Sequence, residues 1–153
     1  MKRYIGTKII HAEPGVAPRD MGAHKAGEPG MIVEYEDGYR SWSPMEVFAA
    51  AYRPCGAMTF GLAVEAMKKG ARVSRAGWNG KGQWIALIDP AALKRLTGGH
   101  QVVGNMEMMT LPYIYIKTVS EGKAPNQPDH LELVPWVASQ TDILAEDWMI
   151  VDE

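Results

Sequence analysis

Residues 71–88 read ARVSRAGWNGKGQWIALI, in which two short apolar runs flank a loop with three glycines within six residues, Gly77, Gly80 and Gly82. Apolar runs bounded by glycine are typical of two β-strands and their connecting loop. Glycine allows positive φ and a close approach of the backbone to a ligand, while Trp78 supplies a flat apolar face and Asn79 an amide. The loop therefore suits a planar, polar small molecule. The alternative is an ordinary hairpin whose tryptophan fills the core.

The chain around this loop reads as one helix followed mostly by strands. Thr59 is the expected N-cap of a helix from Phe60 to Lys69, whose apolar residues share one face and which Gly70 ends. Because hairpin-length or irregular connections join the strands, the pattern predicts an α+β fold, a small antiparallel sheet packed with one main helix. Strands are expected at residues 73–75, 83–88, 113–118, 131–134 and 148–151, and a short helix at 90–96.

A composition change near Pro54 separates an N-terminal annex, residues 1–55, from a main domain, residues 56–153, which is expected to bind the ligand. Asp37-Gly38 suits a tight turn between two strands of the annex. The run Ser43-Pro44-Met45-Glu46 reads as a capping box with proline at the first helical position, and the helix is expected to end near Tyr52. Before that helix, the annex is expected to contain a strand at 4–10, a proline- and glycine-rich loop at 11–30, and hairpin strands at 31–36 and 39–42.

Composition and charge argue against several classes of protein. With 153 residues, of which 46% are hydrophobic and 22% charged, the chain can bury a working core. A net charge of -2 argues against a nucleic acid polymer as partner, because nucleic-acid-binding domains usually carry a basic excess. The lone Cys55 fits a reducing compartment, and we find neither a signal peptide nor a run long enough to cross a membrane. A soluble cytoplasmic protein is expected.

A second informative segment lies near the C-terminus, where residues 133–151 read LVPWVASQTDILAEDWMIV. A strand ends at Pro135, Trp136 follows, and a cluster of hydroxyls and a carboxylate at residues 139–142 begins a short helical turn. These groups suit hydrogen bonds to a polar ligand. A carboxylate near a helix start also complements the unpaired amides and the helix dipole, so helix capping is the alternative role for Asp142.

The sequence offers few reactive groups. Its four histidines lie far apart without a second ligand at metal spacing, and we find no nucleophile elbow, phosphate-binding loop or Cys/His pair. The methionines between residues 106 and 109 are expected to cover an apolar edge or interface. We therefore expect no catalytic residue, no metal site and no cofactor. An enzyme stays open as an alternative, with Asp142 or Glu146 as the general base of nucleotide hydrolysis.

Four ordered motifs resemble those of a known family: MTFGLA at residues 58–63, RAGWNGKG at 75–82, PYIYI at 112–116, and the segment from Trp136 to Trp148. Over about residues 58–152 the chain resembles a small phage domain family that includes the second class of Thoeris anti-defence proteins. Characterised relatives are non-enzymatic sponges, which lower the free concentration of an immune signal by binding it. They are oligomers that hold cyclic ADP-ribose-type signals in pockets between protomers, and some members bind cyclic dinucleotides at separate sites.

The resemblance implies a phage anti-defence protein, directed against Thoeris and CBASS systems, that sequesters such signals without cleaving them in the cytoplasm of the infected host. It also implies a homo-oligomer, with a tetramer favoured. We expect the two tryptophans to stack on a base or close over a ribose, the amide, hydroxyls and carboxylate to hydrogen-bond base edges or hydroxyls, and Arg75 or Lys81 to face phosphate. The expected ligand-binding residues are Arg75, Trp78, Asn79, Lys81, Trp136, Ser139, Thr141 and Asp142.

Another class of function stays open as well. As a structural or interaction protein of a phage particle, the chain would use the annex for docking, bind no small molecule, and keep Trp78 and Trp136 in its core. Partial exposure of Trp78 is the feature that separates this alternative from a ligand-binding protein.

Overall fold

The computed structural model describes residues 1–3, 6–78, 82–89, 102–103, 106–107, 111–120 and 130–151. Backbone contacts divide the chain into two compact units, the N-terminal unit Met1–Pro54 and the C-terminal unit Cys55–Glu153. Helices are few and the sheets are antiparallel, so the α+β class predicted from the sequence is confirmed.

The N-terminal unit is a three-stranded antiparallel sheet followed by a short helix. The predicted hairpin is present: Gly38 has a φ of 79°, and its N–H donates to the carbonyl of Tyr35 at 2.8 Å. Val33 and Trp42 are buried on this sheet. The elements are β1 (His11–Val16), β2 (Pro29–Glu34), β3 (Arg40–Pro44) and α1 (Met45–Ala51), with the strands in the order β1-β2-β3.

The position predicted for the first strand is wrong. Residues 6–10 have no regular secondary structure, and β1 occupies part of the stretch that was expected to be a loop. Pro14 and Gly15 suggested that loop, but β1 is an edge strand, where proline is tolerated. Gly15 is needed there because a Cβ at this position would lie 2.5 Å from the side chain of Ile32.

The start of α1 also differs from the prediction. Pro44 takes the N-cap position rather than the first helical position, and no side chain caps the helix. The hydroxyl of Ser43 donates instead to the carbonyl of Pro44 at 3.4 Å. The predicted capping box is therefore absent, although the predicted helix forms.

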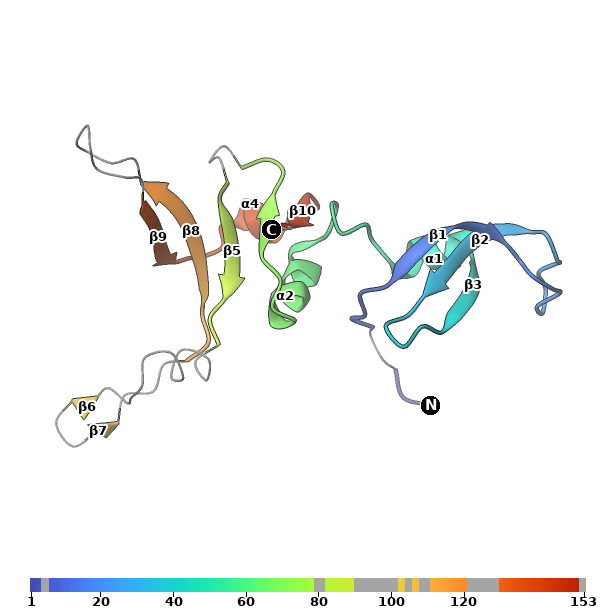
Figure 1. The fold of residues 1–153 in the computed structure, drawn as a ribbon, viewed down its shortest axis with the longest axis horizontal. Coiled ribbons are helices and arrows are strands. Elements are labelled where there is room, and N and C mark those ends of the chain that lie inside the picture. The colour runs from blue at the N-terminus through green and yellow to red at the C-terminus, as the bar shows by residue number, and fades with distance from the viewer. Residues whose placement is uncertain are drawn as a thin grey trace. The chain divides into compact units, whose positions relative to one another are not determined.

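The C-terminal unit is a five-stranded antiparallel sheet with one main helix. Figure 1 shows β9, β8 and β5 side by side, and strand pairing gives the full order β10-β4-β5-β8-β9. All five strands were expected from the sequence, within one or two residues of their observed ends. The elements are α2 (Phe60–Lys68), β4 (Val73–Arg75), β5 (Trp84–Leu87), β8 (Ile114–Ser120), β9 (His130–Pro135), α4 (Gln140–Ile143) and β10 (Trp148–Ile150).

Residues 90–110 carry further predictions for this unit. The short helix expected at residues 90–96 lies outside the described residues, as do the side chains of the methionines expected to cover an apolar edge. In addition, β6 (Val102–Val103) and β7 (Met106–Glu107), which were not predicted as strands, pair as a two-stranded antiparallel sheet.

The main helix begins and ends where the capping residues Thr59 and Gly70 predict. The Thr59 hydroxyl accepts a hydrogen bond from the Leu62 N–H at 3.4 Å, which satisfies one unpaired amide of the first turn. Gly70, with a φ of 91°, follows the last turn. The buried side chains of α2 pack on a sheet face whose fully buried residues include Ile85 and Trp148.

The order of strands determines where the site forms. β4, the first strand of the unit, pairs with β10, the last, so that Trp148 lies opposite Arg75 and Ile150 opposite Val73. Met58, just before α2, forms a further bridge to Trp148. The residues that follow β4 and those that precede β10 are therefore neighbours, although more than sixty positions separate them along the chain.

Candidate functional site

Two segments meet at the end of the β4–β10 pair. Residues 75–78 leave β4 as a turn, the Trp78 turn, and residues 136–147 pass through α4 toward β10, the α4 segment. The Ala76 N–H donates to the carbonyl of Asp147 at 3.1 Å and joins the two segments at the ladder's end. The sequence-predicted residues brought together here are Arg75, Trp78, Trp136, Ser139, Thr141 and Asp142.

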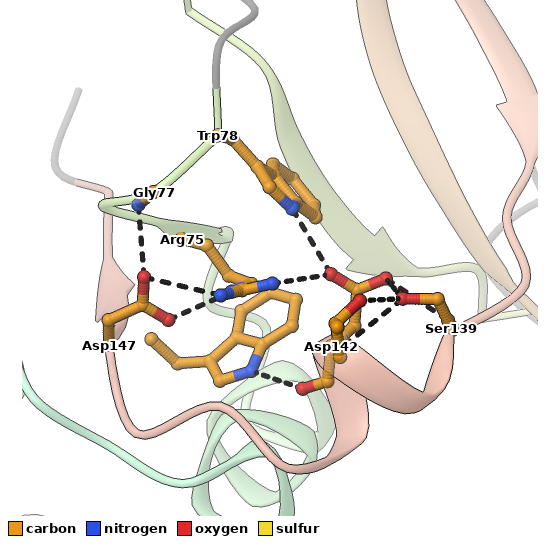
Figure 2. Close-up of polar contacts among 8 residues, drawn as sticks. Arg75, Gly77, Trp78, Ser139, Asp142 and Asp147 are labelled. Atoms are coloured by element: carbon orange, nitrogen blue, oxygen red, sulfur yellow. Dashed lines mark hydrogen bonds and ion pairs between the residues drawn. The ribbon is translucent and has the colours of Figure 1, made fainter.

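The guanidinium of Arg75 lies between two carboxylates, as Figure 2 shows. Its Nε donates to Oδ1 of Asp147 at 2.8 Å, its Nη2 to Oδ2 of the same residue at 3.5 Å, and its Nη1 to Oδ1 of Asp142 at 2.9 Å. Hydrogen bonds to Asp147 and then to Asp142 raise the pKa of Arg75. The side chain is 19% exposed, so the Arg75 seen here is a bridge between two acids and does not face open solvent.

Asp142 accepts hydrogen bonds at both carboxylate oxygens. Its Oδ1 accepts from Arg75 and from the indole Nε1 of Trp78 at 3.3 Å, and its Oδ2 accepts from the N–H and hydroxyl of Ser139 at 3.0 and 2.6 Å. Partial burial acts to raise the pKa of Asp142, but hydrogen bonds from Ser139, Arg75 and Trp78 outweigh it and lower the pKa to about 2. A general base works best with a pKa near the working pH, so this carboxylate is a poor one.

The same carboxylate begins α4. Ser139 is the N-cap of this helix, its hydroxyl accepts from the Asp142 N–H at 3.1 Å, and the two residues form a reciprocal capping box. The Thr141 hydroxyl lies 2.7 Å from that of Ser139, and both residues are exposed. The capping role that the sequence offered for Asp142 is therefore real, and Asp142 binds Arg75 at the same time.

Three indole rings pack edge to face behind this network. Trp148 is fully buried, and its Nε1 donates to the carbonyl of Asp142 at 3.0 Å. Trp78 and Trp136 lie 5.4 and 6.1 Å from its ring and 6.0 Å from each other, measured between centroids. Both are partly exposed while they contact the core. Their rings are thus fixed by packing and still present surface to solvent.

Of the two loop glycines that the structure describes, Gly82 has the expected positive φ and Gly77 has another role. Gly82 has a φ of 65°, as a loop glycine often does, whereas the φ of Gly77 is not positive. Gly77 instead donates its N–H to Oδ2 of Asp147 at 3.0 Å, and a Cβ at this position would lie 3.1 Å from that oxygen. The absence of a side chain at Gly77 is what lets the carboxylate approach.

Sequence reasoning missed one member of the cluster. Asp147 was not among the expected ligand-binding residues, but it binds Arg75 and Gly77, and the hydrogen bond from Arg75 lowers its pKa. Its position just before Trp148 was the only available signal, since that tryptophan begins β10. Two predicted ligand residues, Asn79 and Lys81, lie outside the described residues.

The described residues offer neither a metal site nor a helix able to cross a membrane. Within the described ranges, no group of three or more His, Cys, Asp or Glu side chains could hold a metal ion. The helices found there are also too short or too polar to span a bilayer. The two acids of the site, Asp142 and Asp147, bind the guanidinium of Arg75.

Comparison with known proteins gives the family. Residues 58–151 match the model of the Thoeris anti-defense 2-like domain, Tad2-like. The chain belongs to this family. Thoeris anti-defense 2 of Bacillus phage SP01 is 38% identical over 101 residues, which cover 61% of this chain and 94% of that protein. The family predicted from the sequence motifs is confirmed, and membership supports a phage anti-defence role. The matched residues all lie in the C-terminal unit.

Proposed function

We propose that this protein protects a phage by sequestering cyclic nucleotide immune signals, of the cyclic ADP-ribose type or cyclic dinucleotides, without cleaving them. The observation that carries this proposal is the convergence of two partly exposed tryptophans with exposed hydroxyls at the end of the β4–β10 pair. Membership in the Thoeris anti-defense 2-like family makes an immune signal the reasonable ligand.

Recognition would combine stacking with hydrogen bonds. Trp78 and Trp136 offer aromatic surface to a base or a ribose, and stacking contributes about 1 to 3 kcal/mol per base. Ser139 and Thr141 offer exposed hydroxyls to polar groups of the ligand. Asn79 and Lys81, in the same loop as Trp78, are proposed to supply an amide and a phosphate contact.

A homo-oligomer, with a tetramer favoured, is part of this proposal. A domain of this size rarely encloses a ligand as large as a dinucleotide within one protomer. Apolar side chains are exposed on the α4 segment, where Val137 is 88% and Leu144 75% exposed. Leu133 and Val134 are exposed on β9, at the opposite edge of the sheet from β10. Contiguous apolar patches commonly mark protein interfaces, and we propose that these side chains contact a second copy, which would complete the pocket.

Sequestration rather than hydrolysis is favoured by the state of Asp142, one of the two acids considered as a general base. With a pKa of about 2 and both oxygens already bonded, Asp142 is not available to take a proton from water. A protein of this kind lowers the free signal only by mass action, with at most one ligand held per site. Its place of action would be the cytoplasm of the infected cell, where the signal must be intercepted.

The test is to screen cyclic ADP-ribose isomers and cyclic dinucleotides against the protein and to follow the ligand. Depletion of the free ligand should saturate at a fixed stoichiometry, and heat denaturation should return it chemically intact on chromatography. Trp78→Ala should lose most of the depletion, whereas Trp84→Ala, whose ring pairs with Tyr115 away from the site, should retain it. Cleavage products beyond the protein concentration, or no binding to any of these ligands, would refute the proposal.

A further inference from the structure

Backbone hydrogen bonds alone do not hold the Trp78 turn against the α4 segment. The β4–β10 ladder spans three residue pairs and ends with Trp148 opposite Arg75. Trp78 and the start of α4 lie beyond that end, where the backbone contact of Ala76 with Asp147 is the last link along the ladder. The indole of Trp78 therefore depends on side-chain contacts for its position relative to Ser139 and Thr141.

Besides the packing of Trp78 on Trp136 and Trp148, polar contacts join the two segments through one guanidinium and two carboxylates. Arg75 binds both Asp142 and Asp147. Asp147 then holds the backbone of the Trp78 turn through the Gly77 N–H, and Asp142 holds the Trp78 indole and the Ser139 N-cap. Figure 2 shows these links as one connected set. Charge-assisted hydrogen bonds of this kind are shorter and stronger than neutral ones, so they can fix a geometry before a ligand binds.

We propose that Arg75 and Asp147 are positioning residues, which lock the Trp78 turn onto the α4 segment so that the binding surface is preorganised. This inference rests on the proposed function, because it assigns their effect on ligand binding to that same surface. Preorganisation raises affinity by removing the ordering cost that binding would otherwise carry. Neither residue needs to touch the ligand for this to hold.

The alternative role for Arg75, contact with a ligand phosphate, predicts the opposite effect of one substitution. Asp147→Asn removes a negative charge that now binds the guanidinium. If Arg75 contacts phosphate, the substitution frees it and binding of an anionic ligand becomes tighter. If Arg75 positions the Trp78 turn, the link to Gly77 and Arg75 weakens and binding becomes weaker.

Substitution of Asp147 can test the positioning role without disturbing the fold of α4. Asp142 caps α4, so its loss would disturb that helix as well as the network. The contacts of Asp147 within the described residues go to the Trp78 turn, and its side chain is 34% exposed. Asp147→Asn therefore leaves the capping box of Ser139 and Asp142 in place. Glu146→Gln is the matched control, since it removes the same charge from the preceding residue, which is exposed.

The first measurement is the affinity for the cyclic ADP-ribose isomer that the parent binds in the screen. Asp147→Asn should bind it roughly fivefold to twentyfold more weakly, and Glu146→Gln about as tightly as the parent. Gly77→Ala should weaken binding too, because its Cβ would press on the Asp147 carboxylate without any change of charge. Tighter or unchanged binding by Asp147→Asn would overturn the positioning role.

The second measurement needs no ligand. The protein is labelled with 5-fluorotryptophan, and the fluorine resonance of Trp78 is assigned by its loss in Trp78→Phe. In the ligand-free protein, Asp147→Asn should shift or broaden this resonance, and Glu146→Gln should leave it unchanged. A Trp78 resonance identical to that of the parent would overturn the inference. A changed resonance in a protein that binds none of the ligands would support positioning of Trp78 and refute the proposed function alone.

Discussion

Replacing Asp142 with asparagine should remove a pH-dependent part of the stability of the C-terminal unit. Burial acts to raise the pKa of this carboxyl, but hydrogen bonds from Ser139, Arg75 and Trp78 lower it from 3.8 to about 2. One pKa unit corresponds to about 1.4 kcal/mol, so ionised Asp142 adds on the order of 2 kcal/mol to the free energy of unfolding at neutral pH. Because the pKa is lower in the folded chain, this contribution is complete above about pH 5 and is lost as the pH falls to about 2.

Urea unfolding at neutral pH and at a series of acidic values down to about pH 3 measures this contribution. Tryptophan fluorescence in a Trp42→Phe background reports on the C-terminal unit alone, because Trp42 is the tryptophan of the N-terminal unit. By about pH 3 the parent should lose about 1 kcal/mol more than Asp142→Asn, since the folded carboxyl is still mostly ionised at that pH. Equal losses in parent and variant would refute the argument that bonding to the ionised form lowers this pKa.

Three further predictions concern side chains of the C-terminal unit. Trp148→Ala should lower the free energy of unfolding by about 3 to 5 kcal/mol in the urea assay, because this indole is fully buried, and a loss below about 1 kcal/mol would contradict its place in the core. Trp136→Ala should weaken ligand binding in calorimetry and cost less stability than Trp148→Ala, because Trp136 is partly exposed; equal stability losses would make it a core residue only. Leu144→Glu should lower the mass measured by light scattering, and an unchanged mass would exclude this side chain from the interface.

Local signals predicted α2 and the strands of the five-stranded sheet well. The N-cap Thr59 and the glycine at position 70 set the bounds of α2, and short apolar runs between polar connections located the strands. The same kind of signal was misleading in the N-terminal unit. Pro14 and Gly15 indicated a loop, yet they occupy an edge strand whose neighbour, Ile32, requires a glycine. Local composition cannot show which strand lies at an edge, because the sheet decides that.

The sequence indicated several residues of the site, but it did not indicate how they contact one another. Trp78 and Asp142 could be named from loop and helix-start patterns, because each pattern is local. Their contacts with each other and with Arg75 depend on the pairing of β4 with β10, whose partners lie 73 to 77 positions apart in the chain. No local pattern contains that pairing. For this reason the sequence suggested that Arg75 faces a phosphate, and it could not show that Asp142 and Asp147 bind the guanidinium.

The pairing that builds the site also brings together the two ends of the C-terminal unit. The Ile150 N–H donates to the carbonyl of Cys55 at 3.0 Å, and Met58 and Trp148 exchange backbone hydrogen bonds of 2.8 and 3.1 Å. A unit whose ends meet can receive additional sequence at either end without strain on its sheet, and it can be inserted into a loop of another protein. It is also a natural subject for circular permutation, in which a short linker joins residues 55 and 151 and new termini open at an exposed turn.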